Sequence, residues 1–427
     1  MTTGLILAAP SSGSGKTTIT LGILRALSRK GQIVRGAKSG PDYIDPRFHE
    51  AACGHPCHNL DAWAMNVERI ISLASGPGVL LIEGAMGLFD GAPPDGRGAT
   101  ADLGRHLALP TVLIVDVSHM AQSVAPIVDG FARHSWGTPV TGVILNKVGS
   151  ERHERMLRKA LEPVGIPVLG AVHRQGGLTH PDRHLGLVQA RERPDLDAYL
   201  DAAADAVEKA IDLDALLKLV EPLPEPGKSP AMAPPAQNIA VASDDAFAFA
   251  YPHLFNDWRD AGASLQFFSP LANEPPPECD LIVLPGGYPE LHAGRISACQ
   301  TFMQGMKSSA QDTLIYGECG GYMTMGEGLI DADGRRHQML GLLALETSFA
   351  KRKLHLGYRY LKSSSGAFQG HFTGHEFHYA TTLKAEGDPL FEAKDAEKTD
   401  LPPMGLARGN CSGSFAHIID AALPLPG

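Results

Sequence analysis

The chain has 427 residues, of which 44% are hydrophobic and 20% are charged, and its formal net charge is −10. This length is sufficient for two or three domains with complete hydrophobic cores, and the composition is ordinary for a globular protein. The acidic charge argues against a nucleic-acid partner, because binding to phosphates normally requires a basic surface. The sequence shows no run of 18 apolar residues and no basic leader before its first apolar segment. We therefore expect no membrane span and a cytoplasmic location.

Short apolar segments alternate with amphipathic helical patterns over the first 219 residues, approximately. Helical patterns include Thr17–Arg29 and Arg152–Leu161. The expected strands are Leu5–Ala8, Val79–Ile82, Thr111–Val115, Val140–Leu145 and Val168–Val172. These strands are almost wholly apolar and bounded by Gly or Pro, which is typical of a parallel sheet covered on both faces. The pattern predicts an α/β domain with a doubly wound parallel sheet.

A phosphate-binding loop, Ser11-Ser-Gly-Ser-Gly-Lys-Thr-Thr18, follows the first expected strand and opens the first helix. Its glycines let backbone N–H groups approach a phosphate, the helix N-terminus favours negative charge, and Lys16 adds a positive charge. The strict motif has glycine where this chain has Pro10. Asn146-Lys147, at a later strand end, resembles the pair that reads adenine in several phosphate-loop families, although asparagine is also common in turns. The residues expected to contact ATP are Gly13, Ser14, Gly15, Lys16, Thr17, Thr18, Asn146 and Lys147.

Two carboxylates are expected beside this loop. Glu83 follows the strand Val79–Ile82, and a carboxylate at the C-terminal end of a central strand lies next to the phosphate crevice. Asp45 lies in the loop Lys38-Ser-Gly-Pro-Asp-Tyr-Ile-Asp-Pro46, where a turn or helix-cap role is the alternative. Magnesium prefers hard oxygen ligands, so Thr17, Asp45 and Glu83 together with ATP phosphates are the predicted metal site.

The cysteines at positions 53, 57, 279, 299, 319 and 411 show no paired framework of the secreted type. Cys53 and Cys57 lie close together in Cys53-Gly-His-Pro-Cys-His58, but no second ligand pair follows at zinc-finger spacing. Ordinary thiols in a loop are therefore the better interpretation than a structural zinc site.

A proline-rich segment separates the first pattern from a second one. The segment 221–235 is too rich in proline for a helix or a central strand, and indicates an exposed, semi-stiff linker. A second α/β pattern follows, with strands expected at Asn238–Ala242, Leu281–Leu284 and Thr313–Tyr316. We expect domains at residues 1–220 and 238–427, joined by a linker at 221–237.

Cys319 lies in Tyr316-Gly-Glu-Cys-Gly-Gly321, between an expected strand and a helix-like segment. The flanking glycines permit the tight turn that exposes a nucleophile, and the helix N-terminus is expected to lower the thiol pKa. The Gly286-Gly287 turn offers backbone N–H groups for an oxyanion hole. A single cysteine is more often a buried core residue, but the glycines and the strand context favour a nucleophile here.

A thiol nucleophile needs a base, and histidine is the usual one. His417 is the predicted base and His378 the second choice. Asp420 could orient His417, but the usual His-x-Glu spacing is absent, so a dyad and a triad both remain open. The histidine-rich segment 371–379 could indicate metal ligands, but its strand-like alternation favours a polar binding strand.

Several longer sequence segments occur along the chain in an order that is specific to one protein family. They are Ala8-Ala-Pro-Ser-Ser-Gly-Ser-Gly-Lys-Thr17, Lys38–Pro46, Asn146-Lys-Val-Gly149, Arg183-His-Leu-Gly-Leu187, Leu284-Pro-Gly-Gly-Tyr-Pro-Glu-Leu-His292, Gly317-Glu-Cys-Gly-Gly-Tyr-Met323, His375-Glu-Phe-His-Tyr379 and Gly413–Asp420. Over essentially its whole length the chain resembles the corrin a,c-diamide synthases of cobalamin biosynthesis. The resemblance implies a dethiobiotin-synthetase-like ATP domain, followed by a class I glutamine amidotransferase domain and, in the assembled enzyme, a homodimer.

The resemblance also implies the reaction. ATP and Mg²⁺ would convert the a and c acetate carboxylates of hydrogenobyrinic acid into acyl phosphates, and ammonia released from glutamine would displace the phosphate. Cys319 would attack glutamine with His417 as its base. Glutamine and its oxyanion would be bound by Gly286, Gly287, Glu290 and Gly320. The substrate side of the ATP site would be lined by Lys38, Asp42, Tyr43 and Asp90.

Three alternatives remain open at this point. The substrate could be the cobalt-containing cobyrinic acid, or the enzyme could be a cobyric acid synthase that amidates other side chains. A signalling or partitioning ATPase is the alternative from a different class. Arg183-His184 is expected near the substrate or the domain interface, with helix capping as its alternative role.

Overall fold

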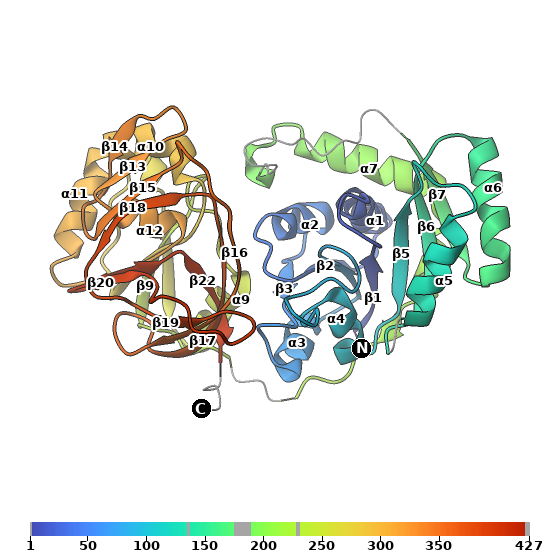
Figure 1. The fold of residues 1–427 in the computed structure, drawn as a ribbon, viewed down its shortest axis with the longest axis horizontal. Helices are drawn as coiled ribbons and strands as arrows, with labels where there is room; N and C mark the ends of the chain where they lie inside the picture. The colour runs from blue at the N-terminus through green and yellow to red at the C-terminus, as the bar shows by residue number, and fades with distance from the viewer. Residues whose placement is uncertain (1, 135–136, 175–188, 228–230, 423–427) are drawn as a thin grey trace. The chain divides into compact units, whose positions relative to one another are not determined.

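Contacts along the chain divide it into two units, Met1–Pro230 and Ala231–Gly427 (Figure 1). The computed structural model describes residues 2–134, 137–174, 189–227 and 231–422. The division falls inside the predicted linker, whose limits remain a prediction. The linker's first two residues, Glu221–Pro222, form strand β8 and pair with β1 of the first unit. Arg183-His184 lies outside the described residues.

The first unit is built around a parallel sheet with the strand order β3-β2-β4-β1-β5-β6-β7, to which β8 adds an antiparallel pairing. Its strands are β1 Thr3–Ala8, β2 Val34–Ser39, β3 His58–Leu60, β4 Val79–Glu83, β5 Thr111–Asp116, β6 Val140–Val148 and β7 Val168–His173. The apolar residues of β1 and β5 are almost completely buried, as expected for central strands covered on both faces. The predicted doubly wound parallel sheet is confirmed.

Helices cover this sheet. They are α1 Lys16–Arg29, α2 Asp45–Cys53, α3 Val67–Ala74, α4 Thr100–Leu107, α5 Val124–His134, α6 Glu151–Leu161, α7 Leu196–Ala210 and α8 Leu213–Leu217. Figure 1 shows α7 lying across α1. A Cβ atom on Gly22 of α1 would lie 2.6 Å from the carbonyl oxygen of Ala203 on α7, so glycine allows this close approach. Arg25 on α1 also pairs with Asp201 on α7 at 2.8 Å.

The second unit contains a six-stranded sheet with the order β10-β9-β11-β12-β21-β20, parallel except for β20. Its strands are β9 Asn238–Ala242, β10 Ser264–Phe268, β11 Leu281–Leu284, β12 Leu314–Glu318, β20 Leu406–Arg408 and β21 Cys411–Ser414. Its helices are α9 Pro252–Asp260, α10 Pro289–Ala298, α11 Gln300–Ser309 and α12 Gly320–Met325. The three strands predicted for this domain are thus confirmed as β9, β11 and β12.

Two four-stranded sheets complete the second unit, in the orders β14-β13-β15-β18 and β19-β16-β17-β22. Their strands are β13 Gly328–Ile330, β14 Arg336–Gln338, β15 Ala344–Ser348, β16 His355–Ser363, β17 Gly370–His378, β18 Thr381–Glu386, β19 Glu392–Lys394 and β22 Ala416–Ala421. Within the described part of the chain, no helix has the length and apolar character needed to cross a membrane.

Candidate active sites

The phosphate loop connects the C-terminal end of β1 to the start of α1. Gly13 and Gly15 have φ angles of 76° and 83°, in the left-handed region that favours glycine. A Cβ atom on Gly15 would also collide with Nδ2 of Asn146. The backbone therefore has the form that the sequence motif predicts, with α1 directed away from the loop.

Lys16 is almost completely buried in this loop, with 7% of its surface exposed. Its Nζ donates to the carbonyl oxygens of Met86, at 2.6 Å, and Ser11, at 3.2 Å. Burial lowers the pKa of Lys16, and the charge of Glu83 partly opposes this effect. The ammonium group is thus held at the loop by backbone oxygens that a phosphate oxygen could replace.

Glu83 lies at the end of β4 and is fully buried. Its Oε1 accepts hydrogen bonds from Thr17 Oγ1 at 2.6 Å and Lys38 Nζ at 2.8 Å, and its Oε2 lies 2.6 Å from His49 Nε2. Lys38 Nζ also donates to Asp45 Oδ2 at 2.6 Å. Burial opposes ionisation, but the charge of Lys38 and the hydrogen bond with His49 hold the pKa of Glu83 well below its usual range. The three predicted magnesium ligands therefore form one connected cluster: Asp45 and Glu83 share the Lys38 ammonium group, and Thr17 bonds to Glu83.

The residues predicted to line the substrate side take several different positions. Lys38 lies in strand β2 with 4% exposure, whereas the sequence analysis placed it in a loop. Asp42 Oδ1 accepts the N–H groups of Ile44 and Asp45 at the start of α2, and burial together with the charge of Asp45 raises the pKa of Asp42 to about 6. Tyr43 is buried. Asp90 is exposed and accepts the N–H group of Gly87 at 2.9 Å.

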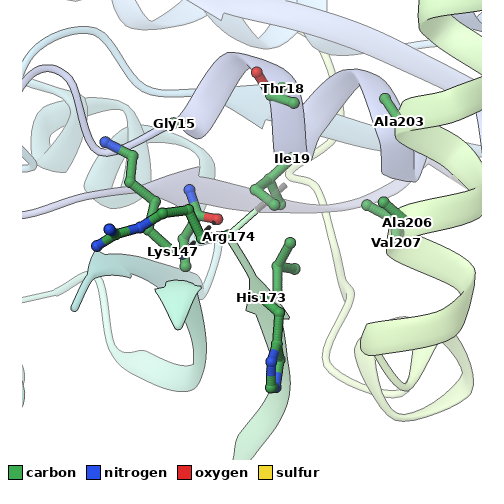
Figure 2. Close-up of a pocket in the computed structure, with 11 residues that line it drawn as sticks. Gly15, Thr18, Ile19, Lys147, His173, Arg174, Ala203, Ala206 and Val207 are labelled. Atoms are coloured by element: carbon green, nitrogen blue, oxygen red, sulfur yellow. Dashed lines mark hydrogen bonds between the residues drawn. The ribbon is translucent and has the colours of Figure 1, made fainter. Parts of the chain in front are cut away.

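A cavity of about 230 Å³ lies beside the phosphate loop (Figure 2). It is lined by Gly15, Thr18, Ile19, Asn146, Lys147, Val172, His173, Arg174, Ala203, Ala206 and Val207. In Figure 2, the side chains of Ala203, Ala206 and Val207 approach from α7, opposite the long side chains of Lys147 and Arg174. An apolar wall with polar groups at its edge is typical of a small-molecule site, and its position next to the phosphate loop fits the base and sugar of a nucleotide.

Asn146 and Lys147 are engaged by the protein itself. Asn146 Nδ2 donates to the carbonyl oxygen of Ser14 at 2.9 Å, and its Oδ1 accepts the N–H group of Lys147. Lys147 Nζ contacts Asp116 Oδ2 at 2.6 Å and the carbonyl oxygen of Gly13 at 3.0 Å. Both side chains therefore brace the phosphate loop, a role that the sequence analysis did not assign to them.

Cys319 joins β12 to α12 in a strained turn, with φ 45° and ψ −102°. Its N–H group donates to the carbonyl oxygen of Ser414 at 2.8 Å. The thiol is buried, and burial together with the charge of Glu290 raises the pKa of Cys319 well above its usual value. The hydrogen bond from Gly320 acts in the opposite, predicted direction, but burial outweighs it. The helix N-terminus therefore lowers this pKa as predicted, but by less than burial raises it.

The predicted base and the predicted oxyanion turn meet at Cys319. A Cβ atom on Gly286 would lie 3.3 Å from Cβ of Cys319 and 2.8 Å from Nε2 of His417, so only glycine fits between them. A Cβ atom on Gly320 would lie 2.9 Å from the backbone nitrogen of Gly287. His417 is fully buried on β22. The fold thus brings Gly286, Cys319 and His417 together, although Gly286 and His417 lie more than 130 positions apart in the sequence.

Comparison with known proteins identifies the family. The CobQ/CobB/MinD/ParA nucleotide binding domain matches residues 5–187, and the CobB/CobQ-like glutamine amidotransferase domain matches residues 238–422. A protein of Brucella anthropi named hydrogenobyrinate a,c-diamide synthase is 52% identical over 98% of each chain. The chain belongs to the hydrogenobyrinate a,c-diamide synthase family.

Other members of this family match equally well. The relative from Sinorhizobium sp. is 53% identical over 98% of this chain and 99% of its own length, and that from Rhodobacter capsulatus is 50% identical over 97% and 98%. A nucleotide-binding domain followed by a glutamine amidotransferase domain makes this family member a glutamine-dependent amide ligase. The family resemblance inferred from the sequence is confirmed, and the partitioning-ATPase alternative is wrong.

Two residues near these sites escaped the sequence analysis. His49, on α2, contacts Glu83. Glu318, the residue before Cys319, places its Oε2 3.5 Å from His417 Nδ1. The side chain of Asp420, considered earlier for that position, accepts the N–H group of Ala421 at 2.9 Å. The adjacency of Glu318 to the thiol was visible in the sequence, but its distance from His417 depends on the fold.

His378, the second choice as base, belongs to a neighbouring polar network. Its Nε2 lies 3.0 Å from Glu376 Oε1, while Arg359 Nη2 donates to Glu376 Oε2 at 2.7 Å. The rings of His355 and His378 are stacked, with 4.6 Å between centroids and 3° between planes. Imidazole lone pairs lie in the ring plane, so parallel rings cannot both direct a lone pair at one metal ion. This geometry favours the polar strand over a metal site.

Cys53 and Cys57, the two neighbouring cysteines of the first unit, are free thiols. Cys57 Sγ is 3.5 Å from His49 Nδ1, and Cys53 Sγ lies 3.6 Å from the carbonyl oxygen of His55. Burial raises the pKa of both thiols. These positions agree with the interpretation of Cys53 and Cys57 as ordinary thiols.

Proposed function

We propose that this protein uses ATP and glutamine to convert the a and c acetate carboxylates of hydrogenobyrinic acid into amides. The observation that carries the proposal is the 52% identity, over 98% of the chain, to an enzyme named for this reaction. The two sites described above supply the two chemical requirements. One is a place to phosphorylate a carboxylate, and the other is a nucleophile that releases ammonia from glutamine.

In the second unit, the thiol of Cys319 attacks the amide carbon of glutamine and forms a thioester. His417 takes the thiol proton and transfers it to the leaving nitrogen, which departs as ammonia. Backbone N–H groups at the turn around Gly286, Gly287 and Gly320 stabilise the negative charge on the amide oxygen. Water then hydrolyses the thioester to glutamate. Glu290, buried close enough to influence the thiol, is the candidate for binding the glutamine amino group.

In the first unit, a substrate carboxylate oxygen attacks the γ-phosphate of ATP, giving an acyl phosphate and ADP. Ammonia then attacks the acyl carbon, and inorganic phosphate leaves. Activation is needed because a carboxylate is a poor electrophile at neutral pH. Lys16 stabilises the charge that develops on the transferred phosphoryl group. Asp42, Tyr43 and Asp90 are the proposed substrate-side residues.

Thr17, Asp45 and Glu83 would hold the magnesium ion. Their oxygen atoms match its ligand preference, and the two carboxylates already bind a cation, the ammonium group of Lys38, while Thr17 bonds to Glu83. Bound magnesium would neutralise phosphate charge during the transfer. A homodimer remains a prediction from the family resemblance.

The test uses purified protein with ATP, magnesium and glutamine, supplied with hydrogenobyrinic acid or with cobyrinic acid. Mass spectrometry counts the amides formed. Two additions to hydrogenobyrinic acid are the expected result, and addition to neither corrin would overturn the proposal. A clear preference for cobyrinic acid would support the cobalt-containing alternative. The Cys319→Ala protein should lose amidation with glutamine but retain it with free ammonia.

A further inference from the structure

A carboxylate lies beside the proposed base of the glutaminase site. Glu318 ends strand β12 and directly precedes Cys319, and its Oε2 is 3.5 Å from Nδ1 of His417. Both side chains are largely removed from water, with 12% and 1% exposure. We propose that Glu318 is the positioning acid of the glutaminase site, so that the acid and the nucleophile are consecutive residues. This inference rests on the glutaminase reaction proposed above.

The carboxylate is anchored to the strand that carries the base. Glu318 Oε1 accepts the N–H group of Ile418, the residue after His417, at 3.0 Å. The hydroxyl group of Tyr316 donates to the same oxygen at 3.2 Å. Strand β12 belongs to the six-stranded sheet, whereas β22 belongs to a different sheet. Glu318 therefore connects the sheet that carries the nucleophile to the sheet that carries the base.

The contact also bears on which ring nitrogen is left to act as the base. Nδ1 of His417 lies 3.5 Å from Glu318 Oε2, while the Cε1–Nε2 edge of the ring adjoins Gly286, where an added Cβ atom would lie 2.8 Å from Nε2 and 3.3 Å from Cβ of Cys319. A carboxylate at Nδ1 favours the tautomer that carries its proton there, which leaves the Nε2 lone pair ready to accept the thiol proton. The 3.5 Å separation is long for a hydrogen bond, and such contacts commonly shorten when substrate binds.

The chemistry of the thiol explains why an acid is needed. Because burial raises the pKa of Cys319, the base must remove the proton during attack, and this creates an imidazolium in a buried site. A nearby negative charge stabilises that cation. The sequence offers no acid at the usual His-x-Glu position, where this chain has Ile419. Another buried carboxylate nearby, Glu376, already accepts hydrogen bonds from Arg359.

The test compares Glu318→Gln with the wild type in the full-length protein. The substitution removes the charge and nearly preserves the shape. We expect kcat for glutamine hydrolysis to fall by at least about 100-fold, as for loss of the acid in other triads, with KM for glutamine changed less than about threefold. Amidation with free ammonia should remain unchanged. Glu318→Asp restores the charge and should retain more activity than Glu318→Gln.

Tyr316→Phe is the matched control, because it removes a hydrogen bond to Glu318 and leaves the carboxylate in place. It should cost less than about tenfold in kcat. Wild-type kcat in Glu318→Gln would overturn the inference, as would a change confined to KM or an equal loss of ammonia-dependent amidation. Glutaminase activity that survives in Cys319→Ala would instead overturn the proposed function, so the two failures are distinguishable.

Discussion

Nζ of Lys38 lies 2.8 Å from Oε1 of Glu83 in the interior of the first unit, and their side chains are 5% and 0% exposed. Burial alone would lower the pKa of Lys38, but the charges of Asp45 and Glu83 raise it well above its ordinary value. The ammonium group therefore stays charged at neutral pH and balances the acidic residues beside the phosphate loop.

Replacing Lys38 by methionine should destabilise the first unit. The change leaves the buried Glu83 and the partly buried Asp45 without their cation, and breaking a buried ion pair from one side costs about 3–5 kcal/mol. Denaturant unfolding measures the loss. Lys159→Met is the control, because this lysine is 79% exposed in its pair with Glu162 and its replacement should have little effect on stability. Equal effects of the two substitutions would contradict the buried-pair assignment.

The protein should become less stable at low pH, because Glu83 becomes protonated there. The pKa of this group is lower in the folded state than the value of about 4.3 expected in the unfolded chain. Its contribution is therefore fully present well above about pH 4.3 and is lost progressively as the pH falls from there toward the lower folded-state pKa. Comparison of unfolding free energies at about pH 7 and about pH 3 should show a smaller difference for Glu83→Gln than for the wild type. An unchanged difference would mean that other carboxylates dominate the acid response.

The substitution Gly286→Ala should abolish glutamine hydrolysis. The new Cβ atom would occupy space taken by the His417 ring, so base and nucleophile could not keep their positions. We expect at least about a 100-fold loss of glutaminase activity, comparable with damage to an oxyanion hole. Amidation with ammonia should persist. Gly294→Ala provides the control, because its Cβ atom would lie 3.5 Å from the nearest atom, an ordinary contact.

The substitution Asn146→Ala tests whether Asn146 stabilises the phosphate loop or recognises the adenine base of ATP. Loss of the hydrogen bond to Ser14 should loosen the phosphate loop and raise KM by about 3–10-fold for any nucleoside triphosphate. Steady-state kinetics with ATP and GTP would measure both values. An effect restricted to ATP would show that the amide reads adenine, as the sequence resemblance first indicated.

Strands could be predicted from the sequence where apolar side chains alone determine the structure. Strand β1 is almost wholly apolar, and its predicted and observed limits differ by two residues. Strand β2 was not delimited, because it contains Arg35 and Lys38. Both are buried through specific partners: Arg35 donates to the carbonyl oxygens of Ala74 and Pro77, and Lys38 contacts acidic side chains. Such burial depends on partners distant in the sequence.

In the candidate sites, too, local turns could be predicted from the sequence, whereas contacts between distant residues could not. Motif spacing located Cys319 and the phosphate loop, because each depends on a short turn whose glycines are recognisable. The carboxylate next to His417 could not be found in this way. Glu318 lies about 100 residues before His417, and the two residues belong to strands of different sheets that the fold brings together. The lowering of the Cys319 pKa by the helix N-terminus could be predicted from the local sequence, whereas the larger opposing effect of burial depends on the fold.

The contact between Gly22 and Ala203 has a consequence for nucleotide choice. Ala203 forms part of the wall of the cavity beside the phosphate loop, and its carbonyl group rests against Gly22, one turn of α1 beyond Thr18. The width of that cavity is therefore set by a backbone contact outside its lining. A side chain introduced at position 22 would push α7 outward, so, if this cavity holds the nucleobase, selectivity among nucleoside triphosphates would change through a residue that does not line the cavity.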